Sequence, residues 1–340
     1  MLSGGTPFSA TYIKKAMKNH KLLEVENLKK YYPVTGGLLY RHLGDIKAVD
    51  GVSFYIMEGE ALGLVGESGC GKSTLGRTIL RLEEPTEGKV VYRGTDITRL
   101  GRKELRGLRR EIQIIFQDPQ SSLDPRMTIG QSIGEALLIH GLRDEGQRGR
   151  RVSDMLERVG LESQHALRYP HEFSSGQRQR IGIARALATS PRLIIADESV
   201  SALDVSIQAQ ILNLMLELRR EFRLAYLFIA HDLSVIRQVS QRVAVMYLGR
   251  LVELAEAGEI FANALHPYTE ALISAIPSIR QGKRKTRILL PGSVPSPLNP
   301  PPGCRFHTRC HRVLPICHRA EPHLKDAGNG HLVACHLYGI

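Results

Sequence analysis

The sequence predicts an α/β fold built around a parallel β-sheet. Short, fully apolar runs at residues 61–65, 193–196 and 225–230 have the composition of buried central strands. A helical pattern at 207–220 separates the last two runs, as expected of a β-α-β unit. A glycine-rich stretch, residues 66–71, lies between the first run and a further helical pattern. Together these observations predict parallel strands that are joined by helices.

The other elements follow in chain order. Residues 22–28 alternate apolar and polar side chains like a half-buried strand, and residues 46–56 form a second extended stretch. Residues 75–82 have a helical pattern, and residues 112–116 are apolar enough for another strand. From residue 118 to 172 the pattern is mainly helical, with glycine and proline as interruptions.

The chain is predicted to divide into three parts. Residues 1–20 form an N-terminal tail, and residues 21–280 form the α/β domain, with a helical subdomain at about 118–175. Residues 281–340 are a proline-rich linker and a small extension that contains four cysteines. The boundary is placed where the composition shifts to GKRKTR and then to PGSVPSPLNPPPG, which is typical of a stiff linker.

The composition excludes several classes of protein. Of 340 residues, 42% are hydrophobic and 24% are charged, which argues against a disordered chain, a fibrous repeat or a coiled coil. No run approaches the ~20 apolar residues that span a bilayer, and the first residues lack the apolar core of a secretory signal, so a cytoplasmic location is expected. The net charge of +12 is dispersed, with denser runs at 102–110 and 280–287, and is interpreted as surface charge.

The glycine-rich stretch fits the phosphate-binding pattern G-x-x-x-x-G-K-[ST] between a strand and a helix. Gly66 and Gly71 let the backbone bend so that its N–H groups point at phosphate oxygens. Lys72 would reach the β- and γ-phosphates, and the Ser73 hydroxyl would bind Mg²⁺. The other residues predicted to line the nucleotide are Glu67, Ser68, Gly69, Cys70 and Thr74. Cys70 is expected to fill space rather than to react.

Two further apolar strands end in residues suited to phosphoryl transfer. Asp197 follows the run at 193–196, where it could bind the Mg²⁺ held by Ser73. Glu198 is one residue further on and could orient or deprotonate a water opposite the γ-phosphate. His231 ends the run at 225–230 and is expected to lie beside Glu198 as a second catalytic residue.

With these motifs, residues 21–280 resemble the ATP-binding cassette (ABC) family of P-loop ATPases. The segment FSSGQ resembles the family signature LSGGQ, and SALD, which ends at Asp204, looks like the D-loop. Gln117 in FQDP resembles the Q-loop glutamine, which implies a further Mg²⁺ ligand, and His231 resembles the switch histidine. Tyr32 resembles the aromatic residue that stacks on adenine, with Tyr31 as the rival.

The resemblance also implies that two cassettes face each other head to tail. Each nucleotide would then lie between one P-loop and the partner's signature, whose residues here are Ser174, Ser175, Gly176 and Gln177. Two positions depart from the family pattern. Ser175 replaces the first glycine of the signature pair, and Ser199 replaces the proline that often follows the catalytic glutamate. Ser175 places a Cβ where the phosphate of the partner's nucleotide would approach. This puts in question how strongly the signature binds that phosphate, but not whether it does.

A narrower resemblance comes from segments outside these motifs. RYPHEFSSGQRQRIGIARAL, HPYTEAL and PSPLNPPPGCRFHTRC are similar to ATPase subunits of bacterial dipeptide and oligopeptide importers, in particular the F-type subunit. This resemblance implies a peripheral protein on the cytoplasmic face of the inner membrane. Its implied partners are a second, paralogous ATPase, two permease subunits and a periplasmic peptide-binding protein. Residues 117–139 would receive the permease's coupling helix.

Two other functions stay open at this point. An importer of nickel or another small solute would share most of these motifs. A non-transport ABC ATPase that acts on nucleic acid or ribosomes would fit the positive charge. However, such proteins usually join two cassettes in one chain or carry long coiled-coil arms, so we expect no nucleic-acid partner.

The four cysteines near the C-terminus suggest a metal site. Cys304, Cys310, Cys317 and Cys335 occur in a short segment with little apolar material, as in loops that a metal holds together. No tight C-x₂₋₄-C pair of the kind zinc prefers is present, whereas a [4Fe–4S] cluster accepts wider spacing. The importer resemblance also implies this cluster. Zinc, with the help of nearby histidines, and four free thiols are the alternatives.

Overall fold

The computed structural model describes residues 21–36, 41–117, 122–201, 203–276 and 287–339. Within these residues the main sheet has eight strands in the order β11-β12-β10-β9-β3-β8-β7-β6. The strands are β3 (Ala61–Val65), β6 (Ile112–Ile115), β7 (Leu193–Asp197), β8 (Ala225–Ala230), β9 (Arg242–Tyr247), β10 (Arg250–Glu256), β11 (Lys325–Asp326) and β12 (Leu332–Val333). From β6 to β9 the neighbouring strands are parallel, so their carboxyl ends lie at one edge. Every residue of β3, β7 and β8 is buried, which confirms the predicted central strands.

A smaller antiparallel sheet packs beside the main one, in the order β2-β1-β4-β5. Its strands are β1 (Lys21–Gly36), β2 (Arg41–Met57), β4 (Glu87–Tyr92) and β5 (Thr95–Asp96). Both predicted N-terminal strands are therefore present, and both are longer than their apolar patterns indicated. A hydrophobic cluster joins the two sheets through α2 (Lys72–Ile79), and it includes Leu23, Leu64 and Leu75.

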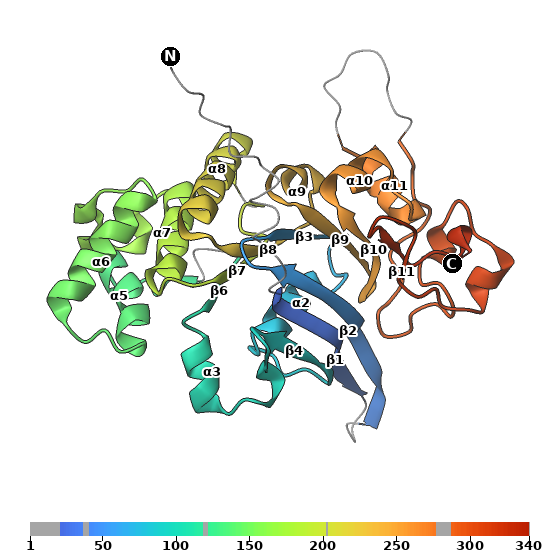
Figure 1. Ribbon diagram of the computed structural model, residues 1–340, viewed down its shortest axis with the longest axis horizontal. Helices are drawn as coiled ribbons and strands as arrows, with labels where there is room; N and C mark the ends of the chain where they lie inside the picture. The colour runs from blue at the N-terminus through green and yellow to red at the C-terminus, as the bar shows by residue number, and fades with distance from the viewer. Residues whose placement is uncertain (1–20, 37–40, 118–121, 202, 277–286, 340) are drawn as a thin grey trace, which may run out of the picture.

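Four of the remaining helices lie along the main sheet (Figure 1): α8 (Val205–Phe222), α9 (Leu233–Val239), α10 (Ala257–Ala262) and α11 (Pro267–Ser274). Helix α3 (Arg102–Leu108) lies away from it, on the side of the smaller antiparallel sheet. The predicted helix between β7 and β8 is confirmed as α8. Among the described residues, none of the helices has the length and apolar character needed to cross a membrane.

The helical segment between β6 and β7 lies at one end of the molecule, where Figure 1 draws it in green. It consists of α5 (Ile129–Ile139), α6 (Glu145–Arg158) and α7 (Ser175–Ala188), with short 3₁₀ turns at Ser163–Leu167 and Pro170–Glu172. Side chains at Thr128, Asp144 and Ser174 accept hydrogen bonds from the first turns of these three helices, which explains where each begins.

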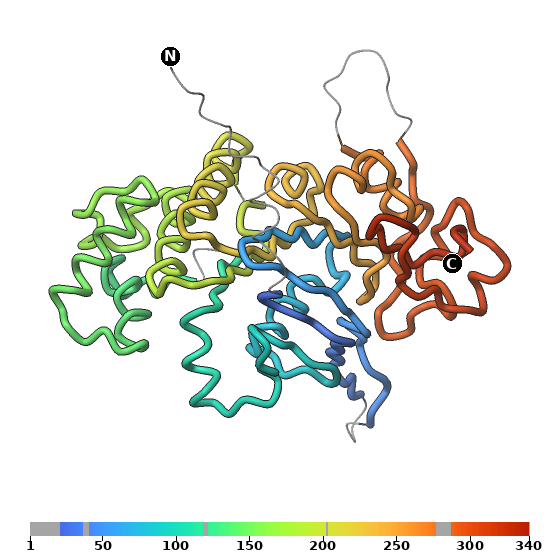
Figure 2. Tube along the Cα trace, in the orientation of Figure 1, coloured from blue at the N-terminus to red at the C-terminus, as the bar shows by residue number. Residues whose placement is uncertain are grey.

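The C-terminal residues 287–339 pack against the opposite end, beside β10 and α11 (Figure 2). Strand β12 pairs with β10 through Val333 and Leu332, and Phe306 enters the hydrophobic core. Strand β11, which pairs with β12, and short 3₁₀ turns at His307–Arg309, Pro315–His318 and His336–Tyr338 account for the other regular structure in this part. The predicted tail at residues 1–20 and the boundary at residue 280 lie outside the described residues.

Candidate functional site

The P-loop follows the carboxyl end of β3 and leads directly into α2. Gly71 stands immediately before the helix with a φ of 104°, a left-handed conformation that glycine adopts readily. A Cβ at this position would lie 1.9 Å from the carbonyl oxygen of Ala48, which is backbone and cannot move aside cheaply. The loop therefore needs glycine at residue 71 both for its conformation and for its contact with β2.

Lys72 holds its ammonium group inside the curve of this loop. The residue is only 4% exposed, and its Nζ donates to the carbonyl oxygens of Gly66 at 2.8 Å and Glu67 at 3.1 Å. Nζ also lies 3.9 Å from Oε1 of Glu198. A buried cation among backbone groups at a helix N-terminus is a suitable partner for a polyphosphate.

Asp197 ends β7, next to the start of α2. Its Oδ1 accepts a hydrogen bond of 2.8 Å from Ser73 Oγ, and the residue is 2% exposed. Burial raises the pKa of Asp197 above its usual value, although the Ser73 hydrogen bond opposes this shift. A carboxylate and a hydroxyl at this separation match the oxygen ligands that Mg²⁺ takes. The structure thus brings together two of the three predicted Mg²⁺ ligands.

Glu198 makes contacts with residues from three other elements. Its Oε2 accepts a hydrogen bond of 2.9 Å from Nε2 of Gln117, which follows β6. The same oxygen lies 3.6 Å from Nδ1 of His231, which follows β8. The Glu198 backbone has a φ of 45°, and its N–H donates a hydrogen bond of 2.9 Å to the carbonyl oxygen of Ile229. This left-handed turn sends the Glu198 side chain in a different direction from Asp197. Gln117, Glu198 and His231 therefore meet, as the strand ends predict.

A cavity of about 260 Å³ lies in front of these groups. Residues 68–74 of the P-loop, Gln117 and Glu198 line it, as predicted. Its wall also includes residues that sequence reasoning missed: Ile46, Lys47 and Ala48 of β2, Leu248 and Gly249 after β9, and Pro297. The strand topology brings the residues of β2 and those after β9 to the cavity wall. Pro297 had no recognisable signal, because it lies in a segment that looks like a linker.

The two candidate tyrosines occupy adjacent positions in β1. The hydroxyl of Tyr31 donates to Asp50, and burial together with this hydrogen bond raises the pKa of Tyr31. Tyr31 pairs with Lys47 and Tyr32 with Ile46, and both partners belong to the cavity wall, while Lys30 Nζ lies 4.8 Å from the centre of the Tyr32 ring. Tyr31 thus has a partner elsewhere, which leaves Tyr32 as the better candidate for contact with a base.

The predicted signature and the D-loop aspartate lie apart from this cavity. Ser174 precedes α7 and accepts a hydrogen bond from Gln177 N–H, while Gly176 is buried against Ile207. Ser174 and Ser175 are exposed at the N-terminus of α7, and Asp204 is exposed before α8. None of these residues is among those that line the cavity within the described part of the chain. The geometry therefore gives the signature residues and Asp204 no role at the P-loop of their own chain.

Comparison with known proteins assigns the chain to a family. A model described as "ABC transporter" matches residues 49–201, and one described as "Oligopeptide/dipeptide transporter, C-terminal region" matches residues 252–317. The oligopeptide transport ATP-binding protein AppF of Bacillus subtilis is 55% identical over 326 residues, which cover 95% of this chain and 99% of AppF. The chain belongs to the family of ABC transporter ATP-binding proteins.

Further relatives agree with this assignment. The dipeptide transport ATP-binding protein DppF of Escherichia coli is 49% identical over 322 residues, which cover 95% of this chain and 96% of DppF. The ATP-binding cassette MJ0796, solved as a dimer in a post-hydrolysis state bound to ADP and Pi, matches with a TM-score of 0.62 and 31% identity. That match covers 69% of this chain and 98% of MJ0796. The predicted family and fold class are confirmed, and the chain is an ABC ATPase.

The cysteines of this ABC ATPase occupy two separate places. Cys70 is buried within the P-loop, and burial raises the pKa of its thiol. The other four lie in the C-terminal part, where burial raises the pKa of Cys304 to about 12 and repulsion from the neighbouring Cys317, Cys335 and Cys310 adds to this rise. Among the described residues, no three His, Cys, Asp or Glu side chains are arranged to hold one metal ion. The predicted metal site thus has no support from this arrangement.

Proposed function

We propose that this chain is the ATP-hydrolysing subunit of an importer for dipeptides or oligopeptides. The observation that carries the proposal is one cavity lined by Lys72, Glu198 and Ser73, the last of which is hydrogen-bonded to Asp197, in a chain that matches peptide-transport ATPases over nearly its full length. ATP hydrolysis would supply the free energy, and the transported solute would contact other subunits.

The contacts support a role for each residue. The P-loop N–H groups and Lys72 would bind the phosphates, and Ser73, Asp197 and Gln117 would bind Mg²⁺, which supplies charge neutralisation at the phosphates. Glu198 would orient the attacking water, and His231, 3.6 Å from it, would hold the carboxylate in place. Tyr32 would stack on the adenine.

We further propose that a second cassette completes the nucleotide site. The exposed Ser174 and Ser175 stand at a helix N-terminus, where backbone N–H groups favour a phosphate. Val205, beside Asp204, is 84% exposed, which is unusual for a large apolar side chain and suits an interface. In a head-to-tail pair, this surface would lie on the partner's nucleotide, and the partner would be a paralogue or a copy of this chain.

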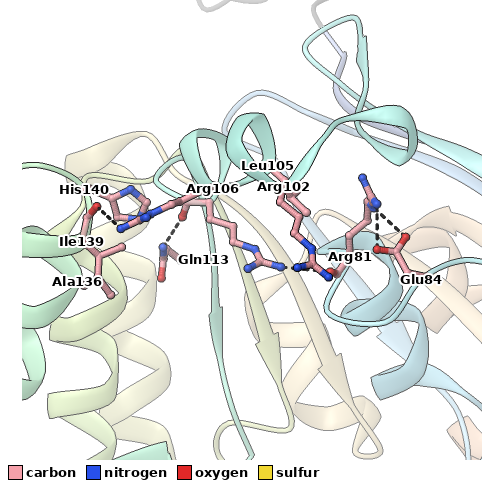
Figure 3. Close-up of a pocket in the computed structure, with 10 residues that line it drawn as sticks. Arg81, Glu84, Arg102, Leu105, Arg106, Gln113, Ala136, Ile139 and His140 are labelled. Carbon is pink, nitrogen blue, oxygen red and sulfur yellow. Dashed lines mark hydrogen bonds and ion pairs between the residues drawn. The ribbon is translucent and has the colours of Figure 1, made fainter.

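A groove of about 640 Å³ between α3 and α5 supports an interaction with a permease subunit (Figure 3). Four arginines line it, Arg81, Arg102, Arg106 and Arg109, against one carboxylate, Glu84. At the α5 end, Leu138 and Ile139 are about half exposed. A permease helix with acidic and apolar residues would match this surface. The groove also includes Gln113, on the strand that leads to Gln117, so docking there could affect the catalytic site.

The remaining parts of the proposal follow from this docking. The chain would sit at the cytoplasmic face of the inner membrane without crossing it, and a periplasmic peptide-binding protein would deliver the solute. A nickel or other small-solute importer is the alternative, since the residues at the ATP site do not contact the solute. The relatives' peptide specificity favours the first reading.

The test is a complete transporter in proteoliposomes, assembled with its permeases, second ATPase and binding protein. We expect ATP-dependent uptake of a labelled dipeptide. Arg106→Glu should reduce uptake and permease association at least tenfold while ATP binding by the isolated chain is unchanged. Arg150→Glu, the same charge change on the exposed side of α6, is the control. Uptake of Ni²⁺ instead of peptide would establish the alternative, and normal uptake by Arg106→Glu would remove the groove from the docking site.

We retain the [4Fe–4S] cluster as a proposal for Cys304, Cys310, Cys317 and Cys335. The Cys304 N–H donates to the Cys317 carbonyl at 2.8 Å, and burial, followed by repulsion from the other three thiols, raises the pKa of Cys304. A single zinc ion needs ligands that converge on one point, whereas a cubane offers each sulfur its own iron. The cluster, when bound, would mainly hold this segment together.

Protein purified without oxygen is expected to contain about four irons per chain and to absorb broadly near ~400 nm. Cys310→Ser should remove most of the iron and the colour, because it deletes one of the four thiolates. Cys70→Ser should retain both, since this thiol lies in the P-loop. Metal analysis and the absorption spectrum check this. One zinc per chain would replace the cluster with a zinc site, and a chain without metal would leave four free thiols.

A further inference from the structure

The second residue of the P-loop, Glu67, connects the nucleotide site to the C-terminal part of the chain. Its carboxylate accepts two hydrogen bonds from Arg309, with Nη1–Oε2 at 2.7 Å and Nη2–Oε1 at 3.1 Å. The two parallel contacts form the fork arrangement in which arginine binds a carboxylate most strongly. The Glu67 N–H donates to the Tyr268 hydroxyl at 2.8 Å, and its carbonyl accepts from Lys72 at 3.1 Å. Every polar group of Glu67 therefore helps to fix the loop.

Arg309 is itself held firmly. Its side chain is 7% exposed, and its Nε donates to the carbonyl of Pro291 at 3.3 Å. Its backbone N–H donates to the carbonyl of Phe306 at 3.0 Å. The Phe306 ring packs against Tyr247 and Tyr268, with ring centres 5.2 Å and 5.4 Å apart. A continuous set of buried contacts thus runs from the C-terminal part to the phosphate-binding loop.

We propose that Arg309 is a positioning residue for nucleotide binding, which acts on ATP through Glu67. The C-terminal part would then belong to the ATP site, and the affinity for ATP would depend on whether that part is docked. This inference rests on the proposed function, because it assigns control of the same nucleotide site.

The charge balance explains why the pair matters. Glu67 places a carboxylate in the loop that receives a polyphosphate, and like charges in a partly buried site repel strongly. Arg309 neutralises this carboxylate and turns it away from the cavity, whose lining does not include Glu67 among the described residues. Without Arg309, the carboxylate would be unpaired and free to turn toward the phosphates. We expect the main effect on affinity rather than on the chemical step, because Glu198 is untouched.

The experiment measures binding of a slowly hydrolysed ATP analogue with Mg²⁺ by the full chain, together with KM and kcat for ATP in the assembled transporter. Arg309→Met should raise Kd and KM about tenfold, as expected for a lost charge-assisted pair, with kcat within about twofold. Arg309→Lys, which keeps the charge but loses the fork, should have a smaller effect. If Arg309→Met does not fold, the same Kd and KM measurements on Arg309→Lys test the proposal instead.

The matched control is Arg312→Met. Arg312 also joins the C-terminal part to α11, through Nη2–Oε1 of Glu270 at 2.6 Å, but it does not contact the P-loop. Its substitution should leave Kd unchanged. Glu67→Gln should suppress the defect, so that Glu67→Gln with Arg309→Met binds as well as Glu67→Gln alone. Equal losses in the Arg309 and Arg312 variants, or additive effects in the double variant, would mean that Arg309 has only a structural role.

Lys72→Ala separates this inference from the proposed function. If Lys72→Ala leaves nucleotide binding unchanged, the proposed ATP site is wrong, and the inference fails with it. If Lys72→Ala abolishes binding and Arg309→Met has no effect, the inference alone is wrong.

Discussion

Replacing Glu198 with glutamine is expected to lower ATP turnover by about 10²–10⁴-fold, which is the usual contribution of a positioned general base. Glutamine has the same size and can still contact Gln117 and His231, so the loop should keep its conformation. ATP and Mg²⁺ binding should persist, because Lys72, Ser73 and Asp197 are unchanged. Hydrolysis of radiolabelled ATP, measured together with the fraction of nucleotide-trapped dimer, checks this.

Two controls make the result specific to Glu198. Glu145→Gln removes a carboxylate that is 91% exposed on α6, and turnover should be unchanged. Asp197→Asn should instead weaken Mg²⁺ binding, so higher Mg²⁺ concentrations should restore part of its activity. Hydrolysis by Glu198→Gln within tenfold of the natural protein would show that another group activates the water.

Gly71→Ala is expected to cost on the order of 3 kcal/mol of stability or more and to abolish nucleotide binding. The new Cβ would meet the Ala48 carbonyl at 1.9 Å, and alanine would be strained at a φ of 104°. Either the P-loop or β2 must move, and both line the cavity. Urea unfolding and equilibrium nucleotide binding measure the two effects.

Gly182→Ala is the matched control, because this glycine lies within α7 and, apart from the nearby backbone of its own helix, no atom lies within 4 Å of the added Cβ. Alanine favours a helix over glycine by roughly 0.5–1 kcal/mol, so this variant should be slightly more stable and bind ATP normally. If Gly71→Ala retained both stability and binding, the close contact with Ala48 could not be what fixes the loop.

The sequence predicted that the proposed catalytic groups lie close together because each one follows a strand with a strong local pattern. Asp197, Glu198 and His231 come directly after fully apolar runs, and parallel strands bring their carboxyl ends to one edge. The choice between Tyr31 and Tyr32 depended on partners elsewhere in the fold. Only the Asp50 contact distinguishes them, because Tyr31 pairs with Lys47 and Tyr32 with Ile46, and both partners line the cavity.

The part that could not be predicted involves contacts between distant residues. Arg309 and Glu67 are 242 positions apart, and an arginine in a proline-rich, irregular segment has no periodicity to indicate its partner. Pro297 likewise reaches the cavity wall because its carbonyl accepts a hydrogen bond from Lys47 N–H at 3.3 Å. Linker composition describes local stiffness and does not show what the segment packs against.

The pairing of β12 with β10 also has a consequence for how the protein is made. Strand β10 is complete at Glu256, but its neighbour is synthesised only at residues 332–333, and the buried contact between His331 and Glu253 forms only then. At a translation rate of ~5–20 residues per second, the edge of β10 stays without its partner on the ribosome for about ten seconds. An unpaired edge strand can pair with other chains. The nascent protein therefore passes through an interval in which this edge of β10 has no partner strand.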